Sequence, residues 1–180
     1  MKLTALSGSL RKQSFNTRLG RLLENVADDH VEVQVADLHG IPLYNGDDED
    51  AHGIPSAVTE LREKIKASDG LIIITPEYNA SMPGVLKNGL DWLTRPGEEM
   101  KPTFGKRPTA LAGATPGAWG TAHAQSSALI NLRQLGVNLF PDYLRVSRAH
   151  ELLDDHEVDS KLKSQAAKWL ENFVKFIDGA

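Results

Sequence analysis

Leu71-Ile72-Ile73-Ile74-Thr75-Pro76-Glu77-Tyr78-Asn79 is the stretch of sequence that decides the fold. Its first four residues form the most apolar run in the chain, which is typical of a strand buried on both faces in a parallel sheet. A proline and polar residues follow at once. We therefore expect a central parallel strand whose following loop presents polar groups.

Short apolar runs alternate with segments of helical period on both sides of this strand, which favours βα units and a doubly wound α/β fold. The other strands are expected at Lys2–Leu6, Val31–Val35, Thr109–Ala112 and at either Val137–Phe140 or Leu144–Val146. Helices are expected around Leu19–Val26, from Pro55, from Pro83, over Thr121–Leu135 and over Ser160–Ile177. The segment before Pro55, with its acidic run Asp47–Asp50, is expected to be a solvated loop. Five parallel strands in the order 2-1-3-4-5 follow, with ligands bound where the loops after strands 1 and 3 diverge.

Composition limits the possible functions. The chain has 180 residues, a net charge of −4, six histidines and no cysteine. We expect one domain over residues 1–180. Disulfides, thiolate metal sites and dithiol redox centres are excluded, so any electron transfer needs a bound cofactor. The charge favours neither nucleic acid nor an anionic membrane, and the histidines lack metal-ligand spacing. The N-terminal apolar stretch is too short for a signal peptide and no run is long enough for a membrane span, so we expect a cytoplasmic protein.

The first loop that could carry chemistry is Ser7–Thr17, between the first strand and its helix. Ser9, Ser14 and Asn16 supply neutral donors, Arg11 supplies a cationic fork, and the segment contains no carboxylate. Free N–H groups at a helix N-terminus also favour an anion, so this loop suits a phosphate monoester. The alternative, that Ser14 or Asn16 only caps the helix, explains one donor but not the whole set.

The second loop, Thr75–Gly84, follows the central strand and is bracketed by two prolines. Its stiff backbone can pair with the polar edge of a heteroaromatic ring, Tyr78 can supply an aromatic wall, and Asn79 both donates and accepts. The alternative is an ordinary turn rich in proline and asparagine. The position of the loop at the expected divergence of the strands favours a ligand-binding role.

Both loops, Gly8-Ser9-Leu10-Arg11-x-x-Ser14-x-Asn16 and Pro76-Glu77-Tyr78-Asn79 with its continuation Pro83–Trp92, resemble the NADPH-dependent FMN reductase family, which includes bacterial quinone, chromate and azo-dye reductases. The similarity spans nearly the whole chain. It implies a flavodoxin-like three-layer α/β sandwich. It also implies an FMN-containing oxidoreductase that takes electrons from NADPH or NADH by hydride transfer and passes them, in ping-pong fashion, to quinones or similar acceptors. The alternative is a flavodoxin-like electron carrier that oxidises NAD(P)H poorly.

The resemblance further implies which residues form the site. The loop after the first strand grips the FMN phosphate, the loop after the central strand lines the isoalloxazine ring, and the loop after the fourth strand borders the other side of the flavin. The residues expected to bind the cofactor are Ser9, Leu10, Arg11, Ser14, Phe15, Asn16, Pro76, Glu77, Tyr78, Asn79, Ala114, Thr115 and Gly117. No side chain is needed as an acid or base, because stacked rings exchange the hydride directly. A homodimer or homotetramer is expected, with Met82, Trp92 and Leu93 as candidate contacts to a partner chain. Trp119 could stack near the flavin or the substrate, or anchor its own loop, and the anchor is the favoured expectation.

Overall fold

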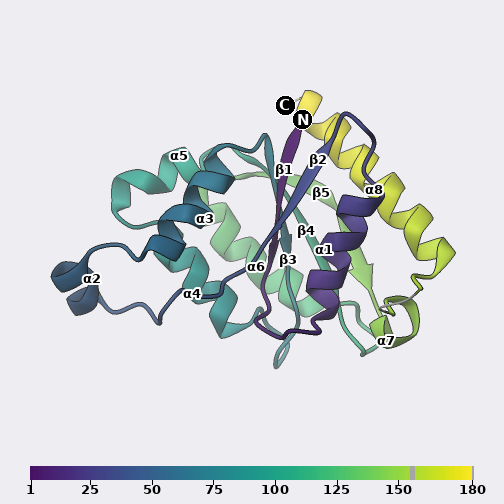
Figure 1. Ribbon diagram of the computed structural model, residues 1–180, viewed down its shortest axis with the longest axis horizontal. Coiled ribbons are helices and arrows are strands. Elements are labelled where there is room, and N and C mark those ends of the chain that lie inside the picture. Colours follow the sequence, from purple (N-terminus) through teal and green to yellow (C-terminus); the bar gives the residue numbers. More distant parts are fainter. Residues whose placement is uncertain (155–156, 180) are drawn as a thin grey trace.

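The computed structural model describes residues 1–154 and 157–179, and within them five strands form one parallel sheet. The strands are β1 (Lys2–Ser7), β2 (Glu32–Ala36), β3 (Gly70–Ile74), β4 (Pro108–Ala114) and β5 (Asn138–Val146). Their order is β2-β1-β3-β4-β5, and every pairing is parallel. The predicted sheet order is therefore confirmed, with β3 in the middle (Figure 1).

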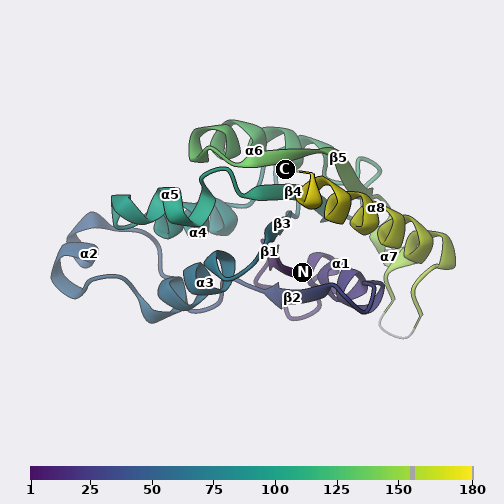
Figure 2. The same ribbon diagram turned by 90° about the horizontal axis from the view of Figure 1, so that it is seen from above.

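Helices cover both faces of the sheet (Figures 1 and 2). They are α1 (Phe15–Asn25), α2 (Gly46–His52), α3 (Ser56–Lys66), α4 (Gly84–Leu93), the 3-10 turn η1 (Gly97–Glu99), α5 (Met100–Phe104), α6 (Ala122–Leu135), α7 (Ala149–Leu152) and α8 (Ser160–Asp178). The helices α1 and α8 lie on one face, and α3, α4, α5 and α6 lie on the other. The three layers of a flavodoxin-like sandwich follow from this arrangement.

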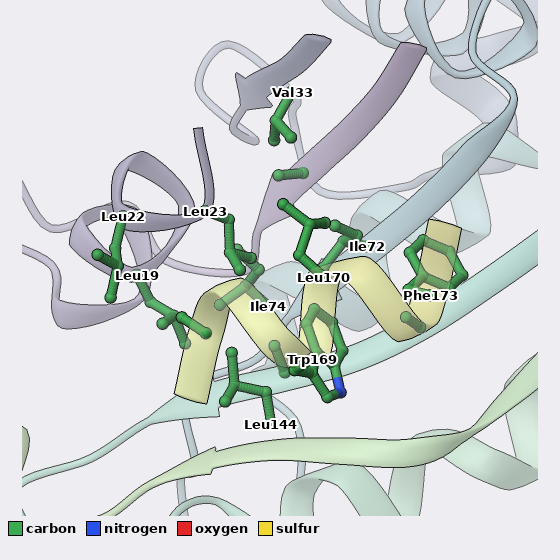
Figure 3. Packing of buried hydrophobic residues seen from close by; sticks show 14 of the residues in the cluster. Leu19, Leu22, Leu23, Val33, Ile72, Ile74, Leu144, Trp169, Leu170 and Phe173 are labelled. Carbon is green, nitrogen blue, oxygen red and sulfur yellow. The ribbon is translucent and has the colours of Figure 1, made fainter. Parts of the chain in front are cut away.

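The central strand shows why the apolar run decides the fold. Successive side chains of a strand point to opposite faces. Ile72 and Ile74 accordingly pack in the core under α1 and α8, while Leu71 and Ile73 pack on the other face. All four side chains are at most 1% exposed. Figure 3 shows Ile72 and Ile74 among side chains from both covering helices.

The fifth strand joins the two positions that the sequence left open. It runs for nine residues, but its register with β4 shifts between Thr109, which pairs with Leu139, and Leu111, which pairs with Tyr143. Pro141 lies inside the shifted stretch and has no N–H to donate to a ladder, which suits an irregular edge strand. The irregularity divides one strand into the two short apolar patterns visible in the sequence.

The segment before Pro55 is partly helical, so the prediction of a loop there was wrong. The Asn45 side chain accepts a hydrogen bond from Asp47 N at 3.1 Å and caps α2. The acidic residues that follow occupy the first helical turn, where negative charge is favourable. A hydrogen bond from Arg95 to Glu49 lowers the pKa of that carboxyl. We call residues 41–54 the arm, because they project from the sheet in both views (Figures 1 and 2).

Residues of α4 hold the base of the arm. The Asn88 side chain accepts from Tyr44 N and donates to Pro42 O, both at 2.8 Å, and Trp92 Nε1 donates to the same carbonyl at 2.9 Å. Trp92 is only 1% exposed within this single chain. Met82 and Leu93 are buried as well, so the expectation that these three side chains contact a partner was wrong.

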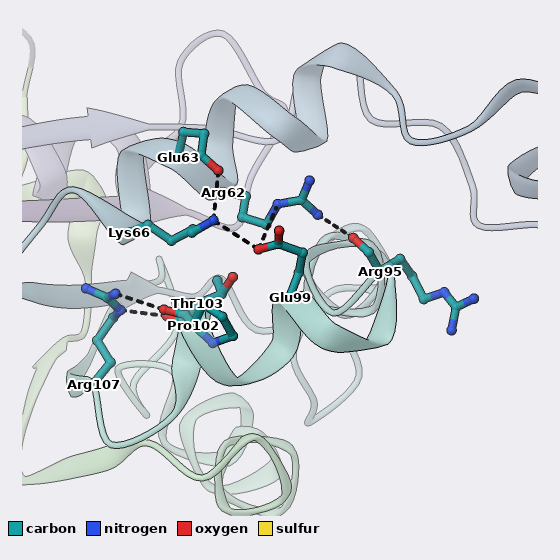
Figure 4. Close-up of polar contacts among 8 residues, drawn as sticks. All are labelled: Arg62, Glu63, Lys66, Arg95, Glu99, Pro102, Thr103 and Arg107. Carbon is teal, nitrogen blue, oxygen red and sulfur yellow. Dashed lines mark hydrogen bonds and ion pairs between the residues drawn. The ribbon is translucent and has the colours of Figure 1, made fainter.

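The short segment from η1 through α5 was not predicted, because its apolar residues are too few to show a period. Charged groups attach it to α3: Glu99 accepts from Lys66 at 3.0 Å, and Arg62 lies 3.8 Å from the same carboxylate (Figure 4). Arg107 donates to the carbonyl oxygens of Thr103 and Pro102. Burial lowers the pKa of Arg107. These polar contacts replace the apolar stripe that a longer helix would use.

Candidate functional site

The loops after β1, β3 and β4 meet at the carboxyl end of the sheet, the lower end in Figure 1. Between them lies a small cavity of about 80 Å³, which we call the hollow. It is lined by Ser9, Arg11, Ser14, Phe15, Asn16, Pro76, Glu77, Tyr78, Ala114, Thr115 and Pro116. The structure thus brings ten of the thirteen predicted site residues together. Leu10, Asn79 and Gly117 lie on the same loops but outside the lining, and Pro116 was not predicted.

The loops after β1 and β3 touch at Gly8. Its N–H donates to Ile74 O at 2.8 Å. A Cβ at this position would lie 3.0 Å from Leu86 Cδ2 and 3.2 Å from Pro76 Cδ. Only a glycine allows the two loops to approach this closely without displacing a neighbour.

Two serines place hydroxyl groups at the hollow. Ser14 Oγ accepts from Asn16 N at 3.2 Å and Thr17 N at 3.3 Å, so Ser14 does cap α1. Ser9 Oγ accepts from Arg11 N at 3.3 Å. Each hydroxyl accepts these bonds and can still donate its own proton to a ligand. Capping and ligand binding are therefore compatible roles for Ser14.

Asn16 braces the site. Its side-chain Nδ2 donates to Ala114 O at 3.0 Å, and its Oδ1 accepts from Ala114 N at 2.9 Å. The residue is 4% exposed. The amide group thus fixes the end of β4 against the start of α1, beside the hollow.

Arg11 is the cationic group at the hollow. Its side chain is exposed, and within residues 1–154 and 157–179 no carboxylate forms an ion pair with it. Leu10 beside it is 43% exposed, and the ring of Phe15 lies 5.5 Å from the Arg18 guanidinium. The Arg11 guanidinium is consequently available to an anion.

The loop after β3 ends in a tight two-residue turn. Tyr78 and Ser81 exchange backbone hydrogen bonds of 3.0 and 3.1 Å, and both residues between them have positive φ, 52° at Asn79 and 58° at Ala80. Asparagine tolerates this left-handed conformation, whereas alanine is strained in it. The turn holds the half-exposed Tyr78 ring beside the hollow.

We expect Ala80→Gly to stabilise the protein by about 0.5–1 kcal/mol. Relief of about 1–2 kcal/mol of left-handed strain exceeds the entropy cost of adding a glycine to the unfolded chain. Urea denaturation measures the change. Ala167→Gly in α8 is the matched control, where the same exchange removes a good helix former and should lower stability by about 1 kcal/mol. Equal destabilisation by both substitutions would contradict the strain at Ala80.

The carboxylate of Glu77 is bound to protein atoms. Its Oε2 accepts from His123 N at 2.9 Å and from Ala124 N at 3.0 Å, at the start of α6. Sequence reasoning assigned Glu77 to the cofactor and missed this contact. One weak hint of this contact was available: α6 has no acidic residue in its first turn and no side chain of its own that caps it, so a cap from another segment is needed.

The loop after β4 is fastened on its far side to β5 and α7. Thr115 N donates to Val146 O at 3.0 Å, and Gly117 O accepts from Arg148 N at 3.0 Å. Trp119 was expected to anchor this loop, but its side chain is 71% exposed, and its ring lies 5.9 Å from that of His123. The expectation of an anchor was wrong, because an anchoring indole would be buried.

The hollow has the chemistry of an anion site, and its volume suits a small group such as a phosphate. Ligand pockets for whole drug-sized molecules are usually about 300–1,000 Å³, so a cavity of about 80 Å³ encloses only part of such a ligand. Hydroxyl groups, the N-terminus of α1 and Arg11 suit a phosphate ester. A flat ring attached to that ester can lie across the open surface beside Tyr78. The residues present therefore fit FMN.

Within the described ranges, no group of three or more His, Cys, Asp or Glu side chains could hold a metal ion. One of the histidines considered in the sequence, His156, lies outside the described residues. None of the described helices is both long enough and apolar enough to cross a membrane.

Comparison with known proteins gives consistent matches. The family model described as NADPH-dependent FMN reductase matches residues 1–151. An NAD(P)H-dependent FMN reductase of Pseudomonas aeruginosa is 45% identical over 125 residues, which cover 69% of this chain and 65% of that protein. A 2-hydroxy-1,4-benzoquinone reductase of Burkholderia sp is 36% identical, over 97% of this chain and 92% of the relative. The solved structure of FerB, a flavoenzyme NAD(P)H:(acceptor) oxidoreductase from Paracoccus denitrificans, superimposes with a TM-score of 0.85 at 32% identity, covering 99% of this chain and 97% of FerB.

Proposed function

Because the chain belongs to the NADPH-dependent FMN reductase family, we propose that it is an NAD(P)H-dependent FMN oxidoreductase that reduces quinones. The observation that carries the proposal is the hollow itself. Ser9, Ser14 and Arg11 meet there beside the stiff loop after β3. A phosphate needs the first set of groups, and a flat polar ring needs the second.

The residues named above divide the cofactor between them. Arg11, the two serine hydroxyls and the N-terminus of α1 would bind the phosphate of FMN. The backbone from Pro76 to Asn79 would pair with the polar edge of the ring, and the loop from Ala114 to Gly117 would border its other side. When bound, FMN supplies the two-electron chemistry, because it accepts hydride equivalents from a nicotinamide and passes them to an acceptor.

The protein contributes position and charge in this scheme. The two loops would hold the ligand in place, and direct transfer between stacked rings requires that a second planar molecule can reach it. Backbone N–H groups of these loops would stabilise negative charge on a bound ring. No side chain is assigned a proton-transfer role.

A quinone is the proposed acceptor, since the benzoquinone reductase relative aligns along nearly the whole chain; chromate and azo dyes are secondary acceptors by the same family reasoning. NADPH and NADH both remain candidate donors. We also propose that the enzyme acts in the cytoplasm, where reduced nicotinamides are supplied, and as a homodimer or homotetramer.

Anaerobic mixing of the FMN-loaded protein with NADPH, and separately with NADH, tests the activity. We expect the flavin absorbance to bleach within seconds with at least one donor and to return when a benzoquinone is added. Stopped-flow absorbance at the flavin band measures both steps. A flavin that binds tightly but is not bleached by either donor would contradict the reductase and favour the alternative, an electron carrier like the flavodoxins.

A further inference from the structure

The N-terminus of α6 is capped by a residue from another loop. The helix is preceded by Thr121, which has a left-handed φ of 63° and makes no side-chain capping bond. The first N–H groups of a helix have no partner within the helix and need one from elsewhere. Glu77, 46 residues away in the sequence, supplies a carboxylate oxygen to two of them, at His123 and Ala124.

A second contact fastens the other end of the same loop. Ser127, one turn further along α6, accepts from Met82 N at 3.0 Å, and its Oγ lies 3.2 Å from Ser81 Oγ. Glu77 and Met82 flank the tight turn at Asn79 and Ala80. The loop after β3 is therefore attached to α6 on both sides of its turn.

A free carboxylate would be a poor neighbour for an anionic ligand. Glu77 lines the hollow that we assign to a phosphate, and like charges that share a site repel. The two N–H donors of α6 and the positive end of the helix dipole offset the charge of Glu77. The carboxylate is thus bound to the N-terminus of α6.

We propose that Glu77 is a positioning residue for the flavin ring. Its carboxylate holds the loop Pro76–Asn79 on α6, so that the backbone groups facing the ring are in place before the cofactor binds. This inference rests on the proposed function and deepens it, because it assigns Glu77 to the loop rather than to the cofactor. Preorganised groups bind more tightly since their ordering costs nothing at the moment of binding.

Two ligands separate the roles of the loops. FMN carries both the ring and the phosphate, whereas riboflavin carries the same ring without the phosphate. A defect in the ring loop should weaken both ligands by the same factor. A defect at the phosphate should weaken FMN alone.

The test uses fluorescence titration of the apoprotein with FMN and with riboflavin. We expect Glu77→Ala to raise both dissociation constants by about tenfold, the scale of one charged cap on a helix. Glu77→Gln keeps an oxygen that can accept both N–H bonds, so both constants should rise by less than about threefold. Ser127→Ala removes the second attachment and should weaken both ligands together, which keeps the test decisive if Glu77→Ala does not fold.

Asp159→Ala is the matched control. Asp159 caps α8 by accepting from Leu162 N at 2.9 Å, so its loss also removes a helix cap, but α8 contributes nothing to the hollow. This variant should lower the melting temperature and leave both dissociation constants unchanged.

If the wild type binds FMN, any one of three results would overturn the inference. They are unchanged ring binding in Glu77→Ala and Ser127→Ala, a loss confined to FMN, or an equal loss in Asp159→Ala. A wild-type protein that binds neither FMN nor riboflavin would overturn the proposed function as well, so the two failures are distinguishable.

Discussion

Replacement of Arg11 by alanine should weaken FMN binding by about 10- to 150-fold. A hydrogen bond to a charged group contributes about 1.5–3 kcal/mol, and each 1.4 kcal/mol corresponds to a factor of ten. Arg11 lines the hollow, and among the described residues no carboxylate forms an ion pair with it. Its side chain is exposed, so the variant should fold normally. Titration of the apoprotein with FMN measures the effect.

Two controls identify the phosphate as the partner of Arg11. Riboflavin lacks the phosphate, so its dissociation constant should be the same in the wild type and in Arg11→Ala. Arg11→Lys keeps the charge but loses the planar fork, so its dissociation constant for FMN should lie between those of the wild type and of Arg11→Ala. If Arg11→Ala weakens the binding of FMN and riboflavin equally, or leaves FMN binding unchanged, the assignment of Arg11 to the phosphate is contradicted.

The second large effect is expected at Gly113, where a single methyl group has no space. The residue is buried near the end of β4, and a Cβ there would lie 1.9 Å from Thr121 Oγ1 and 2.5 Å from Thr75 O. The oxygen of Thr75 belongs to the backbone of the loop after β3, so it cannot rotate away. Gly113→Ala should therefore destabilise the protein by about 3 kcal/mol or more, the upper range for overpacking. Urea denaturation measures the loss.

Controls for Gly113→Ala use the same chemical change elsewhere. At Gly84, the first residue of α4, no described atom lies within 4 Å of an added Cβ. Gly84→Ala should leave stability unchanged or raise it by less than about 1 kcal/mol. The double variant Gly113→Ala with Thr121→Ala removes the nearest contact but not the one to Thr75, so it should recover only part of the loss. Full recovery would show that the backbone is not the barrier.

The sheet was predictable because each strand carries its own local signal. The run Leu71–Ile74 is apolar at every position, and only a strand covered on both faces buries all four side chains. The predicted order and parallel direction are confirmed. The arm was mispredicted because α2 has no buried residue and so no apolar period to detect. The sequence pattern that marks the start of α2 is instead an asparagine cap followed by acidic residues in the first helical turn.

The sequence could predict that the site residues lie on loops at one end of the sheet, but not which contacts they make there. Composition marked Ser9, Ser14 and Arg11 as donors for an anion, and the fold brings them to one hollow. The contacts of Asn16 with Ala114 and of Glu77 with α6 join residues 98 and 46 positions apart. Such pairs depend on tertiary geometry, and no spacing within one loop reveals them.

The distance along the chain between Asn16 and Ala114 has a consequence for how the protein is made. A ribosome that has completed β1, β2 and β3 has produced the serines and Arg11, but not the backbone that Asn16 must grip. Closing a loop of this length costs chain entropy that the contact itself must offset. The pairing of Asn16 with Ala114 can form only once β4 has been synthesised, and we expect the loops to bind the cofactor after that stage rather than during the first half of synthesis.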